Sequence, residues 1–178
     1  MQSFFRSADG RDTRLAAAVR RLLARRGRRD IAAAVCYRWA EDGLRFALVS
    51  TRDGERWTFP KGHRERGESL AGAAAREAGE EAGVGGVIDG RRLLAYRYPG
   101  RGGGDDLVSA FLLRVTRTGG AAESFRRQEW CDEETARRRL AENRDPFHAR
   151  ELERVLELAV VRVGASRAGQ RSRPRAGG

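Results

Sequence analysis

Three glutamates are crowded into the stretch "SLAGAAAREAGEEAG", residues 69–83, and this crowding limits how the chain can fold. The stretch is rich in alanine, begins with a serine and ends with a glycine, so the sequence predicts a helix over these residues. At about 100° per residue, Glu80 and Glu81 project about 60° to one side and about 40° to the other side of Glu77. The three carboxylates therefore share one face of the predicted helix.

The composition of this helix is not one that favours stability alone. Carboxylates at these spacings repel one another by a few tenths of a kcal/mol per pair in water, and by more when they are desolvated. Gly72 and Gly79 each add a helix penalty of about 1 kcal/mol. A hard dication such as Mg²⁺ takes oxygen ligands and would compensate the repulsion. The alternative interpretation is a solvated acidic face without a ligand.

The segments around the helix predict a sheet. Short apolar runs bounded by turn residues indicate strands in "IAAAVCYRW", "LRFALVST", "WTF", "RLLAYRY" and "LVSAFLLRV", with a last strand ending near Trp130. Two more helices are predicted, at about 133–142 and 148–162. An alanine stripe on the acidic helix predicts close packing on that sheet: Ala71, Ala74, Ala78 and Ala82. This order predicts an α+β fold, an α/β/α sandwich with a mixed β-sheet between helical layers.

The net charge of +11 comes from the two ends of the chain. Residues 1–30 contribute +6 and residues 162–178 contribute +5, so residues 31–161 are neutral overall. Basic arms of this kind can tether a protein to RNA, DNA or anionic surfaces by counterion release. A general bias toward arginine is the alternative, since Lys61 is the only lysine in the chain.

A length of 178 residues suits one domain and is too short for two comfortable ones. We expect a basic N-terminal extension with an amphipathic helix over 1–30, a folded central domain over 31–162, and a disordered basic tail over 163–178. The N-terminal stretch is Arg-rich like some transit peptides, but its three aspartates argue against that interpretation. We expect no membrane span and a cytoplasmic location, which also suits two cysteines with no metal or disulfide spacing.

The glutamates belong to a longer pattern. Reading outward from them, the chain has Gly62, five residues, Glu68, seven residues and then "REAGEEAGV", residues 76–84. This resembles the Nudix box, G-x5-E-x7-R-E-U-x-E-E-x-G-U with U aliphatic, in which only Ala78 is smaller than the usual residue. Chance agreement anywhere in the chain is on the order of 10⁻⁴ or less, so the spacing overrules a merely solvated face.

The resemblance implies a metal-dependent active site. Nudix proteins hydrolyse a nucleoside diphosphate linked to another group, or related pyrophosphates, with Mg²⁺ or Mn²⁺. The implied metal ligands are three carboxylates and one backbone carbonyl: Glu77, Glu80, Glu81 and Gly62. Arg76 is implied to pair with Glu68 and Glu80 and to hold that set in place. Glu80, Glu77 or an acid outside the helix would accept the proton of the attacking water.

Similarity to one branch of the family extends over about 31–158. The segments "AAAVCYR", "LVSTRDGERWTFPKG" and "RRQEWCDEETARRRLAENRDPFHARELE" resemble the diadenosine polyphosphate and diphosphoinositol polyphosphate hydrolases. The substrate-binding residues that this implies are basic: Arg38, Arg52, Lys61, Arg126 and Arg127. Arginine suits this role because its planar fork binds phosphate with two hydrogen bonds. Solvated arginines are the alternative, and Glu123 is either an auxiliary metal ligand or an ordinary charge.

The expected substrate is a dinucleoside polyphosphate or an inositol pyrophosphate. "WTFPKGH" has the Pro-Lys-Gly common in dinucleoside polyphosphate hydrolases, and Asp105 and Asp106 would repel a densely phosphorylated inositol. Both features favour dinucleoside polyphosphates. One alternative is an RNA 5′-pyrophosphohydrolase with the basic arms as tethers. Another is a non-catalytic nucleotide- or RNA-binding protein that keeps the Nudix fold.

Overall fold

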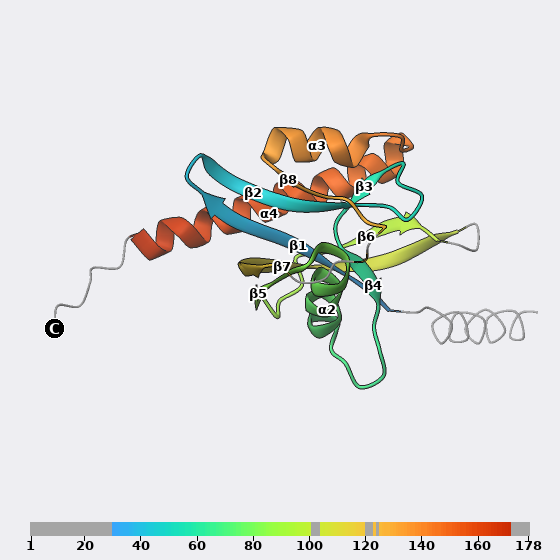
Figure 1. Ribbon diagram of the computed structural model, residues 1–178, viewed down its shortest axis with the longest axis horizontal. Helices are drawn as coiled ribbons and strands as arrows, with labels where there is room; N and C mark the ends of the chain where they lie inside the picture. Colours follow the sequence, from blue (N-terminus) through green and yellow to red (C-terminus); the bar gives the residue numbers. More distant parts are fainter. Residues whose placement is uncertain (1–29, 101–103, 120–122, 124, 172–178) are drawn as a thin grey trace, which may run out of the picture.

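The computed structural model describes residues 30–100, 104–119, 123 and 125–171 (Figure 1). Its helices and strands are β1 (Ile31–Ala40), β2 (Gly43–Ser50), β3 (Trp57–Thr58), β4 (Lys61–His63), α2 (Leu70–Ala82), β5 (Val84–Ile88), β6 (Leu94–Pro99), β7 (Asp105–Thr118), β8 (Gln128–Cys131), α3 (Glu133–Ala141) and α4 (Pro146–Arg171). The amphipathic helix expected within residues 1–30 falls almost wholly outside the described residues.

The strands form one mixed sheet. Its order is β3-β2-β1-β7-β5, with β4 paired to β1, β6 paired to β7 and β8 paired to β2. The central pair, β1 and β7, is parallel, and the other pairs are antiparallel. Figure 1 shows α2 on one side of the sheet and α3 with α4 on the other. The predicted sandwich, a mixed sheet with flanking helices, is therefore confirmed.

Alternation along β1 divides the core into two layers. Ala32, Ala34 and Cys36 belong to the cluster under α2, while Ala33 and Val35 belong to the cluster under α3 and α4. The α2 helix contributes buried alanines to its cluster: Ala73, Ala74, Ala78 and Ala82. These small side chains let the helix approach the sheet closely. Of the predicted alanine stripe, Ala74, Ala78 and Ala82 are buried, whereas Ala71 is only partly buried and Ala73 is buried instead.

Both predicted ends of α2 are present. The Ser69 hydroxyl accepts a hydrogen bond from the backbone N–H of Gly72 at 2.9 Å. Gly83 ends the helix with a φ of 61°, a left-handed conformation that glycine adopts without a side-chain clash. The two caps fix where the acidic face begins and ends.

Two strands were not predicted. The first, β4, has three residues and is defined by its pairing with β1. The second, β5, contains two adjacent glycines, which weaken a strand. A Cβ at Gly86 would lie 2.0 Å from the backbone oxygen of Arg114, so glycine is needed where this strand meets β7.

The disordered tail expected over 163–178 is wrong for its first part. Helix α4 continues to Arg171, and only 172–178 lie outside the described residues. Val163 is 2% exposed within the core, and the Arg167 guanidinium lies 3.8 Å from the ring centroid of Trp39. This part of the helix therefore packs on the β1–β2 hairpin. In the described part of the chain, no helix, including α4, has the length and apolar character needed to cross a membrane.

His148 connects the start of α4 to the start of β7. Its Nε2 lies 2.8 Å from Asp105 Oδ1, and its Nδ1 contacts the carboxylate of Asp145. Burial opposes the charged form, but hydrogen bonds to Asp145 and Asp105 raise the pKa of His148 above 6.5. Since carboxylates only accept hydrogen bonds, both ring nitrogens donate when the imidazole is protonated.

The His148 contact should make stability depend on pH. A pKa raised by folding means that its contribution is fully present below about pH 6.5 and is lost as pH rises through the folded pKa. We expect His148→Gln to lower the free energy of unfolding more at about pH 6 than at about pH 9. Urea unfolding of both proteins measures this, with the exposed His63→Gln as the control. An equal loss at both pH values would contradict the assignment.

Candidate active site

The N-terminal side of the site is built where β4 meets α2. Gly62 pairs with Ala32 of β1, which fixes the strand against the sheet. A Cβ at Gly62 would lie 1.9 Å from Glu77 Oε1, so the carboxylate rests directly against the strand backbone. A glycine is required there because any larger residue would occupy the place of that carboxylate.

Arg76 binds the loop before α2 to the acidic face of the helix. Its Nη1 donates to Glu77 Oε1 at 2.8 Å and to Glu80 Oε2 at 2.7 Å. Its Nε donates to Glu68 Oε1 at 3.3 Å, and its Nη2 donates to the His63 carbonyl at 2.8 Å. Both pairs that the sequence predicted, with Glu68 and with Glu80, are present. Burial opposes its charge, but hydrogen bonds to Glu77 and Glu68 raise the pKa of Arg76.

The three glutamates lie in different environments. The side chains of Glu77 and Glu81 are 11% and 6% exposed, whereas that of Glu80 is 52% exposed. Burial raises the pKa of Glu77 despite Arg76, and burial also raises the pKa of Glu81 despite Lys61 and Arg126. Two of the predicted ligands are thus desolvated carboxylates, which need a cation beside them to remain charged.

Glu81 meets basic residues from two other elements. Its Oε2 accepts a hydrogen bond from the backbone N–H of Lys61 at 3.0 Å, and its Oε1 forms an ion pair with Arg126 Nη2. Arg126 also donates from Nε to Glu123 Oε2 at 2.9 Å and from Nη1 to the Ser50 carbonyl at 2.8 Å. The structure therefore brings Lys61 and Arg126 to the predicted metal face.

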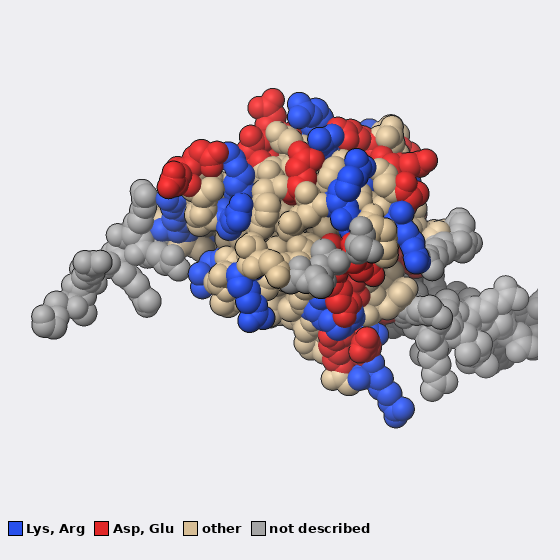
Figure 2. All heavy atoms as spheres, in the orientation of Figure 1, with Lys and Arg blue, Asp and Glu red and all other residues tan. Residues whose placement is uncertain are grey.

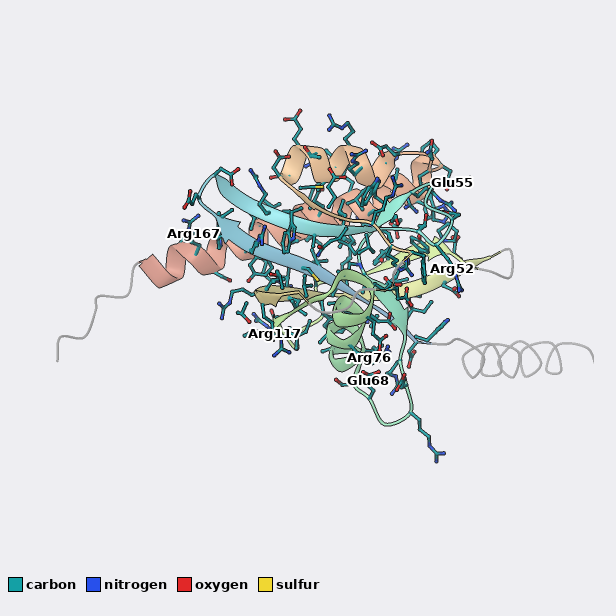
Figure 3. The ribbon with its side chains drawn as sticks, viewed as in Figure 1. Arg52, Glu55, Glu68, Arg76, Arg117 and Arg167 are labelled. Atoms are coloured by element: carbon teal, nitrogen blue, oxygen red, sulfur yellow. The ribbon has the colours of Figure 1, made fainter. Side chains whose placement is uncertain are left out.

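The remaining predicted substrate-binding residues are more dispersed. Arg127 donates from its backbone to Ser50 Oγ at 3.0 Å and from Nη2 to the Gly54 carbonyl at 2.7 Å. The Arg52 guanidinium lies 5.2 Å from the ring centroid of Phe125. Both arginines thus lie by the loop after β2, where Figure 3 labels Arg52.

Arg38 lies away from the acidic face. It is five residues beyond Ala33, the partner of Lys61 in β1, which places it roughly 16 Å along the strand. Its guanidinium lies 3.9 Å from the ring centroid of Trp130. Its Nε is buried without a hydrogen-bond partner among the described residues. The structure does not bring Arg38 together with Glu81.

Residues that sequence reasoning missed support the basic side chains. Ser50 is fully buried and holds both Arg126 and Arg127. Lys61 Nζ lies 4.0 Å from the ring centroid of Tyr98. Burial alone would raise the pKa of Tyr98, but Lys61 and Arg144 outweigh it and lower that pKa. No sequence signal marks Ser50 or Tyr98, because each acts through residues distant in the chain.

The oxygen ligands on this face are of the kind that a hard dication takes, but their side chains do not surround a single point. Figure 2 shows acidic side chains gathered over α2 with basic side chains beside them. Glu77 Oε1 and Glu80 Oε2 lie no more than 5.5 Å apart, the sum of their distances to Arg76 Nη1. Among the described residues, no three acidic, histidine or cysteine side chains are grouped closely enough to enclose a metal. Arg76 and Arg126 hold the carboxylates instead.

Comparison with known proteins agrees with this fold. The sequence profile of the NUDIX domain matches residues 28–154. Diphosphoinositol polyphosphate phosphohydrolase 2 of Rattus norvegicus is 33% identical over 135 residues, which cover 74% of this chain and 73% of that protein. The human protein of the same name is 31% identical, with 74% and 72% covered.

Solved structures share the fold. The C. elegans Ap4A hydrolase has a TM-score of 0.61 and 23% identity, covering 76% of this chain and 98% of its own. A NUDIX hydrolase from Nitrosomonas europaea has a TM-score of 0.57 and 22% identity, covering 77% and 90%. The chain therefore belongs to the NUDIX family. Within it, the chain is a Nudix hydrolase, an enzyme that acts on phosphorus-containing acid anhydrides.

The contact between Gly62 and Glu77 can be tested through stability. Gly62→Ala places a Cβ 1.9 Å from Glu77 Oε1, so the carboxylate has to move. We expect the free energy of unfolding to fall by about 1–3 kcal/mol, as for other overpacked sites. Gly90→Ala is the matched control, because a Cβ there meets nothing within 4 Å. If urea unfolding shows the two variants equally stable, the close approach does not exist.

Proposed function

We propose that this Nudix hydrolase is a metal-dependent pyrophosphohydrolase that cleaves phosphoanhydride bonds of dinucleoside polyphosphates or inositol pyrophosphates. The observation that carries the proposal is the ion pair of buried Glu81 with Arg126, next to the backbone N–H of Lys61. Carboxylates for a cation and basic groups for phosphate oxygens thus lie side by side, as a metal-bound polyphosphate requires.

The metal that we propose is Mg²⁺ or Mn²⁺. The residues that would hold it are Glu77, Glu80, Glu81 and the carbonyl of Gly62. Bound there, it would neutralise charge on the pyrophosphate and lower the pKa of a water molecule. Arg76 would keep Glu77 and Glu80 oriented through its hydrogen bonds. We assign the proton-accepting role to Glu80, since it is the exposed member of the three glutamates.

Basic side chains would orient the polyphosphate. Arg126 pairs with Glu81 on the acidic face, and Lys61 contacts Glu81 through its backbone while its Nζ lies over the ring of Tyr98. Arg127 and Arg52 lie by the loop after β2. A substrate with several phosphates could reach both groups. Arg38 would contact only a part of the substrate distant from the bond that is cleaved.

Different observations favour each of the two substrate classes. The curated relatives are diphosphoinositol polyphosphate phosphohydrolases, and a structural neighbour is an Ap4A hydrolase. Asp105, expected to repel a phosphorylated inositol, faces His148, which partly compensates its charge. Asp105 is therefore less able to repel an inositol pyrophosphate than the sequence predicted, so both substrate classes belong in the test.

A substrate panel tests the proposal most broadly. Phosphate release is measured with Mg²⁺ and with Mn²⁺ on a diadenosine polyphosphate, an inositol pyrophosphate, a nucleotide sugar and a 5′-triphosphorylated RNA. We expect turnover of one or both of the first two. Turnover of the RNA alone would favour an RNA 5′-pyrophosphohydrolase, and tight nucleotide binding without product would favour a binding protein.

The glutamates should be essential for that turnover. We expect Glu80→Gln and Glu81→Gln each to lower the rate by about 10²-fold or more, because an amide replaces an anionic base or ligand. Glu134→Gln, at an exposed position of α3, is the control and should keep the rate of the wild type. Equal rates in the wild type and the two site variants would end the catalytic assignment.

A further inference from the structure

The guanidinium of Arg126 is fixed by contacts within the protein, unlike that of an arginine that is free to bind a substrate. All three of its nitrogens have oxygen partners: Nη2 the Glu81 carboxylate, Nε the Glu123 carboxylate at 2.9 Å, and Nη1 the Ser50 carbonyl at 2.8 Å. Its side chain is only 13% exposed. The guanidinium is therefore fixed between the loop before β8, the end of β2 and the acidic face of α2.

Glu81 is a buried carboxylate with which Arg126 pairs directly. Its side chain is 6% exposed, its Oε1 forms the ion pair with Arg126 Nη2, and its Oε2 accepts a hydrogen bond from the backbone N–H of Lys61 at 3.0 Å. A buried carboxylate needs a paired cation, so removing Arg126 would leave Glu81 without its ion-pair partner.

A dication that binds Glu81 has to compete with this arginine. The metal needs the carboxylate oxygens that Arg126 occupies, and two positive groups at one carboxylate repel each other. When Nη2 leaves Glu81, the bonds to Ser50 and Glu123 can still hold the side chain nearby. A freed guanidinium nitrogen beside a metal site would then be available to donate to a phosphate oxygen.

We propose that Arg126 is a stand-in cation, which occupies Glu81 until the metal binds and is then released toward the substrate phosphate. Arg126 would thus set the affinity for the metal and link metal binding to polyphosphate binding. This inference rests on the proposed function, since it requires the metal to bind at Glu81. It differs from a simple phosphate-binding role, in which Arg126 would not affect binding of the metal alone.

Calorimetry with Mn²⁺ and the full chain, without substrate, tests the competition. Arg126→Gln removes the competing charge and should tighten Mn²⁺ binding by about 10-fold, within the usual range of coupling between sites. Arg56→Gln is the matched control: it removes the same charge from a pair with Asp53, outside the acidic face, and should change the affinity by less than about 2-fold. Unchanged or weaker binding in Arg126→Gln would overturn the proposal.

Stability separates this role from a structural one. In metal-free buffer, Arg126→Gln leaves Glu81 buried without its partner, so its midpoint of urea unfolding should fall below that of the wild type. Saturating Mn²⁺ should remove most of that difference, and folding of the variant only with Mn²⁺ would support the proposal equally. A loss that Mn²⁺ does not reduce would show that Arg126 is merely structural.

The two proposals fail in different ways. If Mn²⁺ binds neither the wild type nor Arg126→Gln, the proposed metal-dependent function fails and the competition fails with it. If Mn²⁺ binds both proteins with equal affinity, the proposed function stands and only the stand-in role of Arg126 is wrong.

Discussion

Neutralising buried carboxylates on one face of α2 is the constraint on which the rest of this site depends. Glu77 and Glu81 are nearly removed from water, so each needs a cation within hydrogen-bonding distance. Arg76 supplies it from the same helix, and Arg126 supplies it from the loop before β8. These arginines also contact Glu68 in the loop before α2 and Ser50 at the end of β2, so four parts of the chain meet around the two buried carboxylates.

The fold places these groups through small residues. Alanines on α2 let the helix lie close to the sheet, and Gly62 lets the strand backbone lie against Glu77. The parallel pair of β1 and β7 forms the middle of the sheet, and β4 joins it by pairing with β1. A helix with larger side chains on that face would stand farther from the sheet. Its carboxylates would then remain in water, where no arginine is needed to hold them.

Local features of the site could be predicted from the sequence. The caps of α2 and the shared face of its three glutamates depend on spacing within one helix. The pair between Arg76 and Glu80 was implied by the resemblance to the Nudix box. The two layers of the sandwich followed from the order of strands and helices. The resemblance to the Nudix box then indicated the role of residues that spacing alone could only group.

Contacts between distant segments could not be predicted in this way. Arg126 and Glu81 are 45 residues apart in the chain, and His148 and Asp105 are 43 apart. Neither pair has a local pattern, because the sheet decides which loops meet. Helix α4 passes its expected end for the same reason: the Arg167 guanidinium packs on the ring of Trp39, which belongs to β1 and is distant in the chain.

We expect the acidic face of α2 to bind a divalent cation beside a polyphosphate. Crystals of the chain grown with Mn²⁺ and a non-hydrolysable diadenosine polyphosphate test it most directly, through the anomalous scattering of manganese. The account predicts a peak at about 2.0–2.6 Å from carboxylate oxygens of Glu77 and Glu81, the range of metal–oxygen bonds. A bound nucleotide with no manganese on that face, or with manganese held elsewhere in the chain, would contradict it.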